Sequence, residues 1–292
     1  MFKGAMTAIV TPFTEKGSID EEALRKLVEF QIKNRIDGLV PCGTTGESPT
    51  LDYDEHEKVI EIVIDAAKGK VPVIAGTGSN SAKEAIEMTR HAADAGANAS
   101  LQVCPYYNKP TQEGLYRHFS AIANAVDIPI VIYNIQGRTG VNIETSTLAR
   151  LAKEHSNIVG VKEASGNVSQ IMEVINDLPK GFDVLSGDDN LTLPLMALGG
   201  KGVISVASNI IPREMHDMCE FALKGNLEKA RQIHYRLLPL FKGIFIETNP
   251  IPIKAALAMK GMIKEAYRLP MCEMKAENRE KLRKILADLK IL

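Results

Sequence analysis

The chain has 292 residues, of which 24 % are charged and 45 % are hydrophobic, a composition typical of globular proteins. Its 35 Lys and Arg residues balance 36 Asp and Glu residues, and the net charge of -1 gives no drive toward nucleic acid or membrane surfaces. The four cysteines form no C-x-x-C pair, which argues against a zinc site or a disulfide framework. The N-terminus lacks the pattern of a signal peptide, and no apolar run approaches the ~20 residues of a membrane span. We therefore expect a soluble cytoplasmic protein with free thiols.

Eight short strand-like segments recur along the chain, most of them about 30 residues apart. They begin at Thr7, Asp37, Val71, Asn98, Ile128, Asn157, Phe182 and Lys201. Most are almost continuously apolar, as parallel strands are when helices cover their outer face. Eight such units predict an α/β fold, a (β/α)8 TIM barrel, although an open doubly wound sheet is the alternative.

Helical patterns separate these segments. Ser18 and Glu21 have the spacing of a capping box and predict the start of the first helix. From about Pro212 the pattern is helical and no further strand is found. We therefore expect a barrel over residues 1–225 and a C-terminal helical extension over residues 226–292 that packs on the barrel.

One lysine is notable for its position in a predicted strand. In the sixth segment, alternation places Val159 and Val161 on one face and Ile158, Gly160 and Lys162 on the other. The valines would face the helices, so Lys162 points into the barrel near the carboxyl ends of the strands, where reactive groups lie. A buried amine loses its charge and becomes the nucleophile that a Schiff base with a carbonyl substrate requires. The alternative is a lysine that reaches the rim or forms an ion pair.

Polar groups end two other predicted strands. Tyr133 closes the fifth segment, where its phenol can move protons beside the lysine, or can simply be a core tyrosine. After the second segment, the turn at residues 43–48 offers backbone amides and the hydroxyls of Thr44 and Thr45, which suit a carboxylate. The alternative is an ordinary turn before a helix. It is not a phosphate-binding loop, because no G-K-[ST] follows.

Other loops carry residues that suit binding. Tyr106 and Tyr107 lie between prolines in a stiff, exposed loop, which indicates a ligand or subunit contact. Arg138 suits bidentate recognition of a carboxylate, although a solvated surface arginine is the alternative. Asp188 and Asp189 follow the seventh segment, where capping of the next helix is favoured over metal binding. The six histidines form no H-x-H or H-E-x-x-H set, so no metal site is expected.

Together these motifs resemble those of one family. The chain contains, in order, GTTGES from Gly43, PYYNKPTQEG from Pro105, YN at Tyr133, RTG at Arg138, VGVKEASG from Val159, LSGDD from Leu185 and GVISVASN from Gly202. From about residue 2 through the C-terminal helices, the chain closely resembles the dihydrodipicolinate synthases. These enzymes belong to the pyruvate-dependent class I aldolase superfamily, which includes N-acetylneuraminate lyase. The resemblance implies an aldol condensation of pyruvate with L-aspartate 4-semialdehyde to 4-hydroxy-tetrahydrodipicolinate, in lysine and diaminopimelate biosynthesis.

The resemblance also implies roles for individual residues. Lys162 matches the Schiff-base lysine and Tyr133 the general acid/base beside it, so no metal or organic cofactor is needed. Thr44 and Tyr107 match the partners of Tyr133 in a proton relay, with Tyr107 reaching in from a neighbouring subunit. Four further positions match substrate-binding residues: Thr45 at the pyruvate carboxylate, Gly187 and Ile204 at the pyruvate site through the backbone, and Arg138 at the semialdehyde carboxylate.

The resemblance implies a homotetramer built as a dimer of dimers, although looser dimers exist in the family. One departure is visible, because the family usually has Tyr-Asn-Val-Pro where this chain has Ile135 and Gln136 after Tyr133-Asn134. We therefore expect a more flexible loop at Arg138. One alternative is a related aldolase that cleaves a sialic acid or a 2-keto-3-deoxy sugar acid, although such relatives commonly lack this arginine. Another is an inactive barrel that serves as a scaffold, against which the retained site residues argue.

Inhibition by lysine is a further implication of the resemblance. Members that respond to lysine bind it at a subunit interface, away from the catalytic lysine. The matching positions are Ser48, Pro49, His56, Asn80, Glu84 and Tyr106. Glu84 would pair with an amine, and His56 would bind the ε-amine, unless both are ordinary solvated helix residues. Tyr53 departs from the histidine often found in the family.

Overall fold

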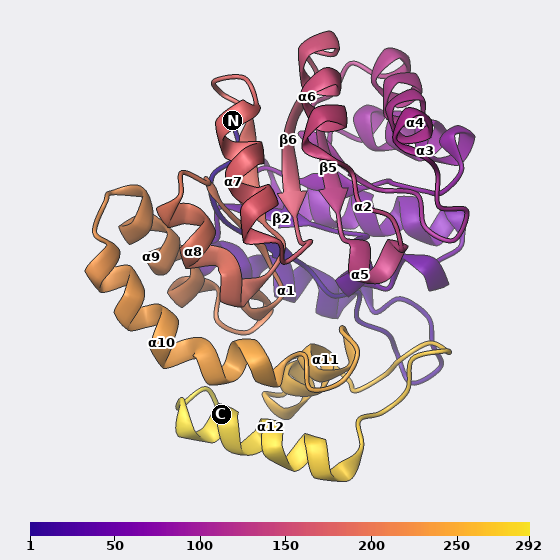
Figure 1. Ribbon diagram of the computed structural model, residues 1–292. Helices are drawn as coiled ribbons and strands as arrows, with labels where there is room; N and C mark the ends of the chain where they lie inside the picture. Colours follow the sequence, from indigo (N-terminus) through magenta and orange to yellow (C-terminus); the bar gives the residue numbers. More distant parts are fainter.

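The computed structural model describes residues 1–292 and contains eight parallel strands surrounded by helices (Figure 1). The strands are β1 (Gly4–Ala8), β2 (Gly38–Val40), β3 (Ile74–Gly76), β4 (Ala99–Val103), β5 (Ile130–Asn134), β6 (Ile158–Glu163), β7 (Asp183–Ser186) and β8 (Gly202–Ser205). Their order is β2-β1-β8-β7-β6-β5-β4-β3. A parallel bridge between Leu39 and Val73 joins the two remaining edges. The predicted (β/α)8 TIM barrel is therefore confirmed, and the open sheet is excluded.

Helices connect the strands and cover the outside of the barrel. They are α1 (Glu21–Lys33), α2 (Tyr53–Ala67), α3 (Ala82–Asp94), α4 (Gln112–Ala125), α5 (Gln136–Thr139), α6 (Thr145–Glu154), α7 (Val168–Asp177), α8 (Thr192–Ala197) and α9 (Pro212–Leu223). Three more follow: α10 (Leu227–Gly243), α11 (Ile251–Met259) and α12 (Ala276–Asp288). None of these helices is both long and apolar enough to cross a membrane.

The core has an inner and an outer layer. The barrel interior is filled by one cluster that includes Met6, Ile74, Leu101 and Leu185, and Tyr133 belongs to it. Outside the strands, two clusters pack the sheet against the helices. Because each strand is covered on both faces, its sequence shows a continuous apolar run and not an alternation.

The last three helices lie together on one side of the molecule, drawn from orange to yellow in Figure 1. Leu237 on α10, Leu257 on α11 and Leu282 on α12 belong to the same buried cluster as Leu24 on α1. This continuous packing places the segment between α10 and α11 beside the barrel, where it contacts the site described below.

Two local expectations were wrong. The helix α1 is capped by Asp20, whose side chain accepts a hydrogen bond from the Ala23 N–H at 3.0 Å. Ser18 instead shares a hydrogen bond with the Thr14 hydroxyl at 2.8 Å, because the chain turns tightly before the helix. The first strand also begins at Gly4 and not at Thr7, since it gains its partners on β8 from that residue onward.

The alternation in β6 was only half right. Ile130 pairs with Ile158, but the next residue of β5, Val131, pairs with Gly160. This register shift inserts Val159, which packs against the interior cluster, whereas Ile158 joins the outer cluster. Beyond the shift the expected alternation resumes, so Gly160 and Lys162 point to the same face of the strand, whereas Val161 faces the helices.

Candidate active site

Lys162 and Tyr133 lie side by side at the carboxyl ends of neighbouring strands. They are register partners in β6 and β5. The Lys162 Nζ lies 4.2 Å from the centroid of the Tyr133 ring, and each residue is 6 % exposed. The barrel register therefore brings an amine and a phenol into contact at the face where barrel enzymes carry their chemistry.

Burial alters the amine of Lys162. It lowers the pKa of this group to about 8, against the opposing effect of Asp188 and Asp189, while Arg138 lowers the pKa further. No carboxylate forms an ion pair with Lys162, so a substantial fraction of the amine is neutral near pH 8. A neutral amine is the form that attacks a carbonyl carbon.

The phenol of Tyr133 is affected in the opposite sense. Burial raises its pKa, Arg138 lowers it, Asp188 raises it and the Thr44 hydroxyl lowers it. Burial is the largest of these effects, so Tyr133 holds its proton at neutral pH and can donate it to a developing oxyanion.

The turn after β2 is held by contacts from distant parts of the chain. Asn249 donates a hydrogen bond from Nδ2 to the Thr45 Oγ1 at 3.0 Å, and the Thr11 hydroxyl donates to the Gly46 carbonyl at 2.7 Å. Cys42 and Glu47, on either side of Thr44 and Thr45, both have φ of 54°. Two non-glycine residues in the left-handed region persist only when their surroundings hold them there.

A cavity of about 610 Å³ opens beside these residues. Thr44, Tyr133 and Arg138 line it, so the structure brings three of the predicted catalytic and substrate-binding residues around one space. Arg138 lies on α5 and donates a hydrogen bond from Nη2 to the Asn249 carbonyl at 3.1 Å. The loop at Gln136 and Gly137 forms a helical turn in this structure.

The remaining predicted substrate positions lie next to Lys162 or inside the barrel. Gly187 lies against the side chain of Lys162: a Cβ built on it would lie 3.2 Å from Lys162 Cε. Its N–H donates to the Glu163 carbonyl at 2.8 Å. Ile204, on β8, is fully buried in the interior cluster.

Tyr107 is not brought to this site. It is 89 % exposed, has φ of 68° and does not line the cavity. Its loop is tied down by Asn80, whose Nδ2 donates to the Tyr106 carbonyl at 3.2 Å, and by Asn108, whose Nδ2 donates to the Asn80 carbonyl at 2.9 Å. Tyr107 is thus presented outward on a fixed loop.

Most of the predicted lysine positions line the same cavity as Thr44 and Tyr133. They are Ser48, Pro49, His56, Glu84 and Tyr106. Asn80 does not line it. His56 Nε2 lies 2.9 Å from the Gly76 carbonyl, and burial lowers the pKa of its imidazole. The Glu84 carboxylate accepts a hydrogen bond from the Ser79 hydroxyl at 2.7 Å.

The two aspartates after β7 do not cap the helix that follows them, contrary to expectation. Neither side chain makes a capping bond there. Asp189 instead accepts hydrogen bonds from the Ser205 hydroxyl and from the N–H groups of Val206 and Ala207, across the sheet. Burial raises the pKa of Asp188 to about 6, and this carboxylate lies close enough to Lys162 to act on its charge.

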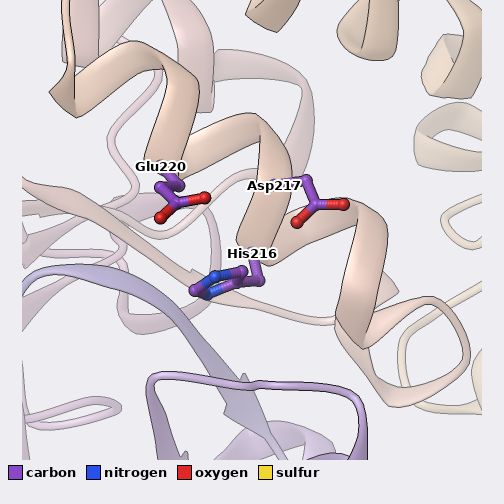
Figure 2. A group of neighbouring side chains, drawn as sticks. All are labelled: His216, Asp217 and Glu220. Carbon is purple, nitrogen blue, oxygen red and sulfur yellow. The ribbon is translucent and has the colours of Figure 1, made fainter.

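One group of potential metal ligands lies elsewhere, on α9. Atoms of His216, Asp217 and Glu220 lie within 4.8 Å of one another (Figure 2). Each of the three already has a partner of its own: respectively Asp37 at 2.9 Å, Arg213 at 2.9 Å and Lys224 at 2.9 Å. The group lies beside Asp37, at the amino end of β2 and so at the end of the barrel opposite the cavity. We assign it no metal.

Three residues at the site were given no role by sequence reasoning: Glu47, Asn249 and Lys254. Lys254 is fully buried, and its Nζ lies 2.5 Å from the Glu47 carboxylate. The available signal was a single lysine in the otherwise apolar helix segment from Ile251 to Met259. A lysine in such a segment needs a buried partner.

The chain is similar to known proteins along almost its whole length. The chain matches the model of the dihydrodipicolinate synthetase family over residues 1–289. It is 59 % identical over 288 residues to the 4-hydroxy-tetrahydrodipicolinate synthase of Syntrophus aciditrophicus, covering 99 % of this chain and 98 % of that protein. The crystal structure of dihydrodipicolinate synthase from Aquifex aeolicus superposes with a TM-score of 0.98 at 53 % identity, covering 99 % of both chains.

Two further solved structures carry small molecules. The chloride-inhibited dihydrodipicolinate synthase from Acinetobacter baumannii, complexed with pyruvate, has a TM-score of 0.98 at 45 % identity and full coverage of both chains. A synthase of this family from Cyanidioschyzon merolae with lysine bound has a TM-score of 0.97 at 44 % identity, covering 100 % of this chain and 99 % of that one. With a family model spanning nearly the whole chain and relatives above 50 % identity along its length, this chain belongs to the dihydrodipicolinate synthetase family.

Proposed function

We propose that this chain is a lyase with 4-hydroxy-tetrahydrodipicolinate synthase activity in lysine biosynthesis, which condenses pyruvate with L-aspartate 4-semialdehyde on Lys162. The observation that carries the proposal is the contact between a buried, largely unpaired amine and a buried phenol at the carboxyl ends of β5 and β6. The family to which the chain belongs supports the same reaction.

The reaction begins at the amine of Lys162. It attacks the carbonyl carbon of pyruvate, a C–N bond forms, and the carbonyl oxygen leaves as water. The protonated imine withdraws electrons, so a methyl proton is lost and an enamine forms. The enamine carbon bonds to the aldehyde carbon of the second substrate, whose own amine then displaces Lys162 and closes the ring.

Tyr133 moves the protons that these steps require. Its raised pKa keeps the phenol protonated, so it donates to the departing oxygen and to the alkoxide formed at the aldehyde. Thr44 lies beside the phenol and connects it toward the cavity. Tyr107 of a neighbouring subunit completes the relay, because its own subunit leaves it exposed.

Carboxylate recognition divides between two places. Thr45 and the backbone at Gly187 and Ile204 hold the carboxylate end of pyruvate near Lys162. Arg138, at the cavity wall, binds the carboxylate of the semialdehyde in a bidentate manner. Since Arg138 also lowers the pKa of Lys162, it keeps the nucleophile neutral before the second substrate arrives.

The active form is a homotetramer built as a dimer of dimers. The exposed loop with Tyr106 and Tyr107 supplies one contact, through which Tyr107 reaches a neighbouring site. Val168 and Met172, one turn apart on α7, expose a second apolar strip that suits the other contact.

Lysine binds in the part of the cavity lined by His56, Glu84 and Tyr106 and inhibits the enzyme. A carboxylate and a buried neutral imidazole in one cavity suit a ligand with ammonium groups. The related structure with lysine bound supports this assignment.

Trapping of the imine tests the proposed reaction. The intact chain is incubated with pyruvate and borohydride, digested and mapped by mass spectrometry, with Lys162→Ala as the control. One reduced pyruvyl adduct on Lys162, absent from the variant, is expected. An adduct that persists in Lys162→Ala overturns the assignment. Supplying the semialdehyde, or the aldehyde products of sialic acid and 2-keto-3-deoxy sugar acid cleavage, then separates this activity from that of the related aldolases.

A further inference from the structure

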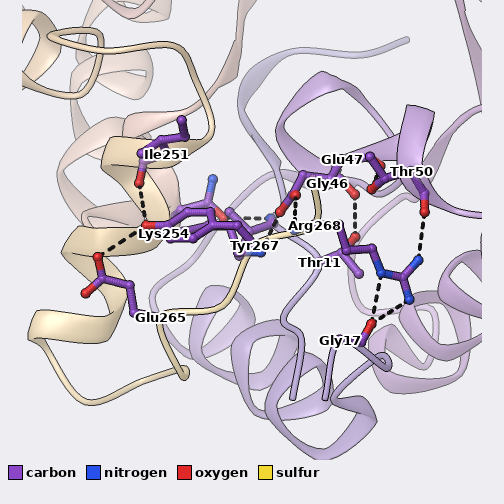
Figure 3. Close-up of polar contacts among 12 residues, drawn as sticks. Thr11, Gly17, Gly46, Glu47, Thr50, Ile251, Lys254, Glu265, Tyr267 and Arg268 are labelled. Atoms are coloured by element: carbon purple, nitrogen blue, oxygen red, sulfur yellow. Dashed lines mark hydrogen bonds and ion pairs between the residues drawn. The ribbon is translucent and has the colours of Figure 1, made fainter. Parts of the chain in front are cut away.

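The turn that carries Thr44 and Thr45 is bound by a buried charge pair from the far end of the chain. The Lys254 Nζ lies 2.5 Å from the Glu47 carboxylate, and the two side chains are 0 % and 1 % exposed. Figure 3 shows Lys254 reaching from the C-terminal part of the chain toward the segment around Glu47. Lys254 lies on α11, and Glu47 directly follows Gly46 in the turn.

This pair lies in a setting that excludes water. The Lys254 Nζ lies 4.3 Å from the centroid of the Phe13 ring and 5.3 Å from that of Tyr267, so aromatic faces surround the ammonium where water would otherwise be. Arg268 lies over the same Phe13 ring, with its guanidinium carbon 4.4 Å from the centroid. In such surroundings removal of Lys254 leaves the buried Glu47 carboxylate with the Arg268 N–H, at 3.4 Å, as its remaining hydrogen-bond donor.

The pair acts on a strained backbone position. Glu47 has φ of 54° and ψ of 34°, and its N–H donates to the Thr44 carbonyl at 3.1 Å. A non-glycine residue in this region is unfavourable by about 1–3 kcal/mol and remains there only when contacts hold it. The Glu47 carboxylate is the anchor of that residue, because its ion pair with Lys254 is the closest contact of its side chain.

Three further contacts bind this part of the chain to the C-terminal part, and in one of them the Arg268 N–H donates to the Glu47 carboxylate at 3.4 Å. Asn249 donates to the Thr45 hydroxyl, as described above, and Arg268 donates from Nη1 to the Thr50 carbonyl at 2.7 Å, two residues beyond the turn. Arg268 is itself held by two hydrogen bonds to Glu55, at 2.5 and 2.6 Å. The turn therefore takes its conformation from residues about 200 positions later in the sequence.

We propose that Lys254 is a positioning residue for the condensation, which fixes Thr44 and Thr45 against Tyr133 and pyruvate through its ion pair with Glu47. This inference rests on the proposed function, because it gives Thr44 and Thr45 their roles in that reaction. Lys254 is already bound to a carboxylate, whereas Lys162 forms no ion pair, so Lys254 does not compete with Lys162 as the nucleophile.

The test separates positioning from stability. In Lys254→Met, kcat per folded enzyme falls about 10- to 100-fold, because small displacements of catalytic groups have effects of this size. The KM for pyruvate rises, since Thr45 shifts, whereas the KM for the semialdehyde is unchanged because Arg138 lies on α5. Lys260→Met, at the end of the same helix, is the matched control, since the Lys260 Nζ contacts only the Ile291 carbonyl among hydrogen-bond partners.

The double variant Glu47→Gln with Lys254→Met gives the decisive measurement. The double variant removes the Glu47 charge together with the Lys254 charge, so its melting temperature is higher than that of Lys254→Met. It can therefore be measured even if Lys254→Met does not fold. The kcat of the double variant stays low, because the side chain introduced by Lys254→Met cannot hold the amide introduced by Glu47→Gln in place. Recovery of kcat together with the melting temperature overturns the proposal. So does an equal loss of kcat in Leu286→Ala, which removes buried side-chain volume from α12 without touching the turn.

Imine trapping on the wild-type chain keeps the two hypotheses apart. If pyruvate is not trapped on Lys162, the proposed function itself fails. If it is trapped, but the double variant turns over at the wild-type rate, only the positioning role of Lys254 is wrong.

Discussion

The Lys162 amine lies over the ring of Tyr133, with Nζ 4.2 Å from the ring centroid, on strands whose register pairs the two residues directly. The arrangement places a nucleophile with a lowered pKa beside an acid with a raised one, because burial disfavours the charged form of each. Amine and phenol are thus both neutral in the same range of pH. This combination favours the reaction, since one group attacks pyruvate while the other donates protons in the steps of the turnover.

The pH dependence of imine formation follows from the charges around Lys162. Its pKa of about 8 predicts that the rate of trapping with pyruvate rises with pH and levels off above about pH 8. Asp188 raises this pKa and Arg138 lowers it. Asp188→Asn therefore shifts the profile to lower pH, and Arg138→Met shifts it to higher pH. Initial trapping rates in buffers between pH 6 and pH 10 measure both shifts, and shifts of equal sign would contradict the electrostatic assignment.

Removing the phenol oxygen tests the acid. Tyr133→Phe keeps the ring beside Lys162, so pyruvate is still trapped, but turnover falls about 10²- to 10⁴-fold because general acid catalysis has this range. Steady-state rates with both substrates, compared with the trapped yield, measure the difference. A variant with an unchanged rate would exclude Tyr133 from proton transfer.

Gly187 is expected to tolerate no side chain. A Cβ at this position would lie 2.5 Å from the Ala164 Cβ and 3.2 Å from Lys162 Cε, neither of which can move far in a packed barrel. Gly187→Ala should therefore displace Lys162 and slow imine formation about 10- to 100-fold. Gly137→Ala is the matched control, because a Cβ there meets nothing within 4 Å. Equal trapping rates in the two variants would show that the site accommodates the methyl group.

The outward position of Tyr107 predicts sharing of sites between subunits. Tyr107→Phe and Tyr133→Phe are each expected to have low activity. When they are co-expressed, the site with a native Tyr133 receives a native Tyr107 from its partner. Activity should return to about a quarter of the wild-type rate, because half of the dimers are mixed and half of their sites are intact. Mixed dimers isolated with two affinity tags should reach about half of the wild-type rate, and inactive mixed dimers would place Tyr107 outside the neighbouring site.

The barrel and its main reactive groups could be predicted because they depend on local patterns. Continuous apolar runs repeat eight times, and the parity of a strand is enough to direct Lys162 inward. The register shift at Val159 shows the limit of such reasoning. An inserted residue changes the face of the sheet to which the residues before it point. Nothing in an unbroken apolar run shows where such an insertion lies.

The contacts that hold the site could not be predicted, because they join distant segments. Glu47 and Lys254 are 207 residues apart, and Asp189 binds backbone groups of the next strand end and not those of its own helix. Sequence spacing carries no information about such partners. The sequence did show a single lysine, Lys254, in an otherwise apolar helix. Because an unpaired buried charge is unfavourable, such a lysine indicates a buried anionic partner somewhere in the fold.

Lysine inhibition is the prediction with the sharpest chemical requirement. His56 Nε2 faces the Gly76 carbonyl and therefore carries the hydrogen, so Nδ1 is a buried acceptor, and it has no partner within the protein. Because burial lowers the pKa of this imidazole, the ring stays neutral and Nδ1 stays available for an ammonium donor. The Glu84 carboxylate lines the same cavity and supplies the charge that an ammonium group needs.

Lysine should therefore inhibit the enzyme at low pyruvate, and L-norleucine, which lacks the ε-ammonium, should not. Glu84→Gln should raise the half-inhibitory lysine concentration at least about 10-fold, since a hydrogen bond to a charged group contributes about 1.5–3 kcal/mol. Glu87→Gln, on the same helix but outside the cavity, should respond to lysine as the wild type does. Rates are expressed relative to each variant without lysine. Equal inhibition by norleucine would mean that His56 and Glu84 do not recognise the ε-ammonium group. Full activity at millimolar lysine would mean that the cavity binds only the substrates.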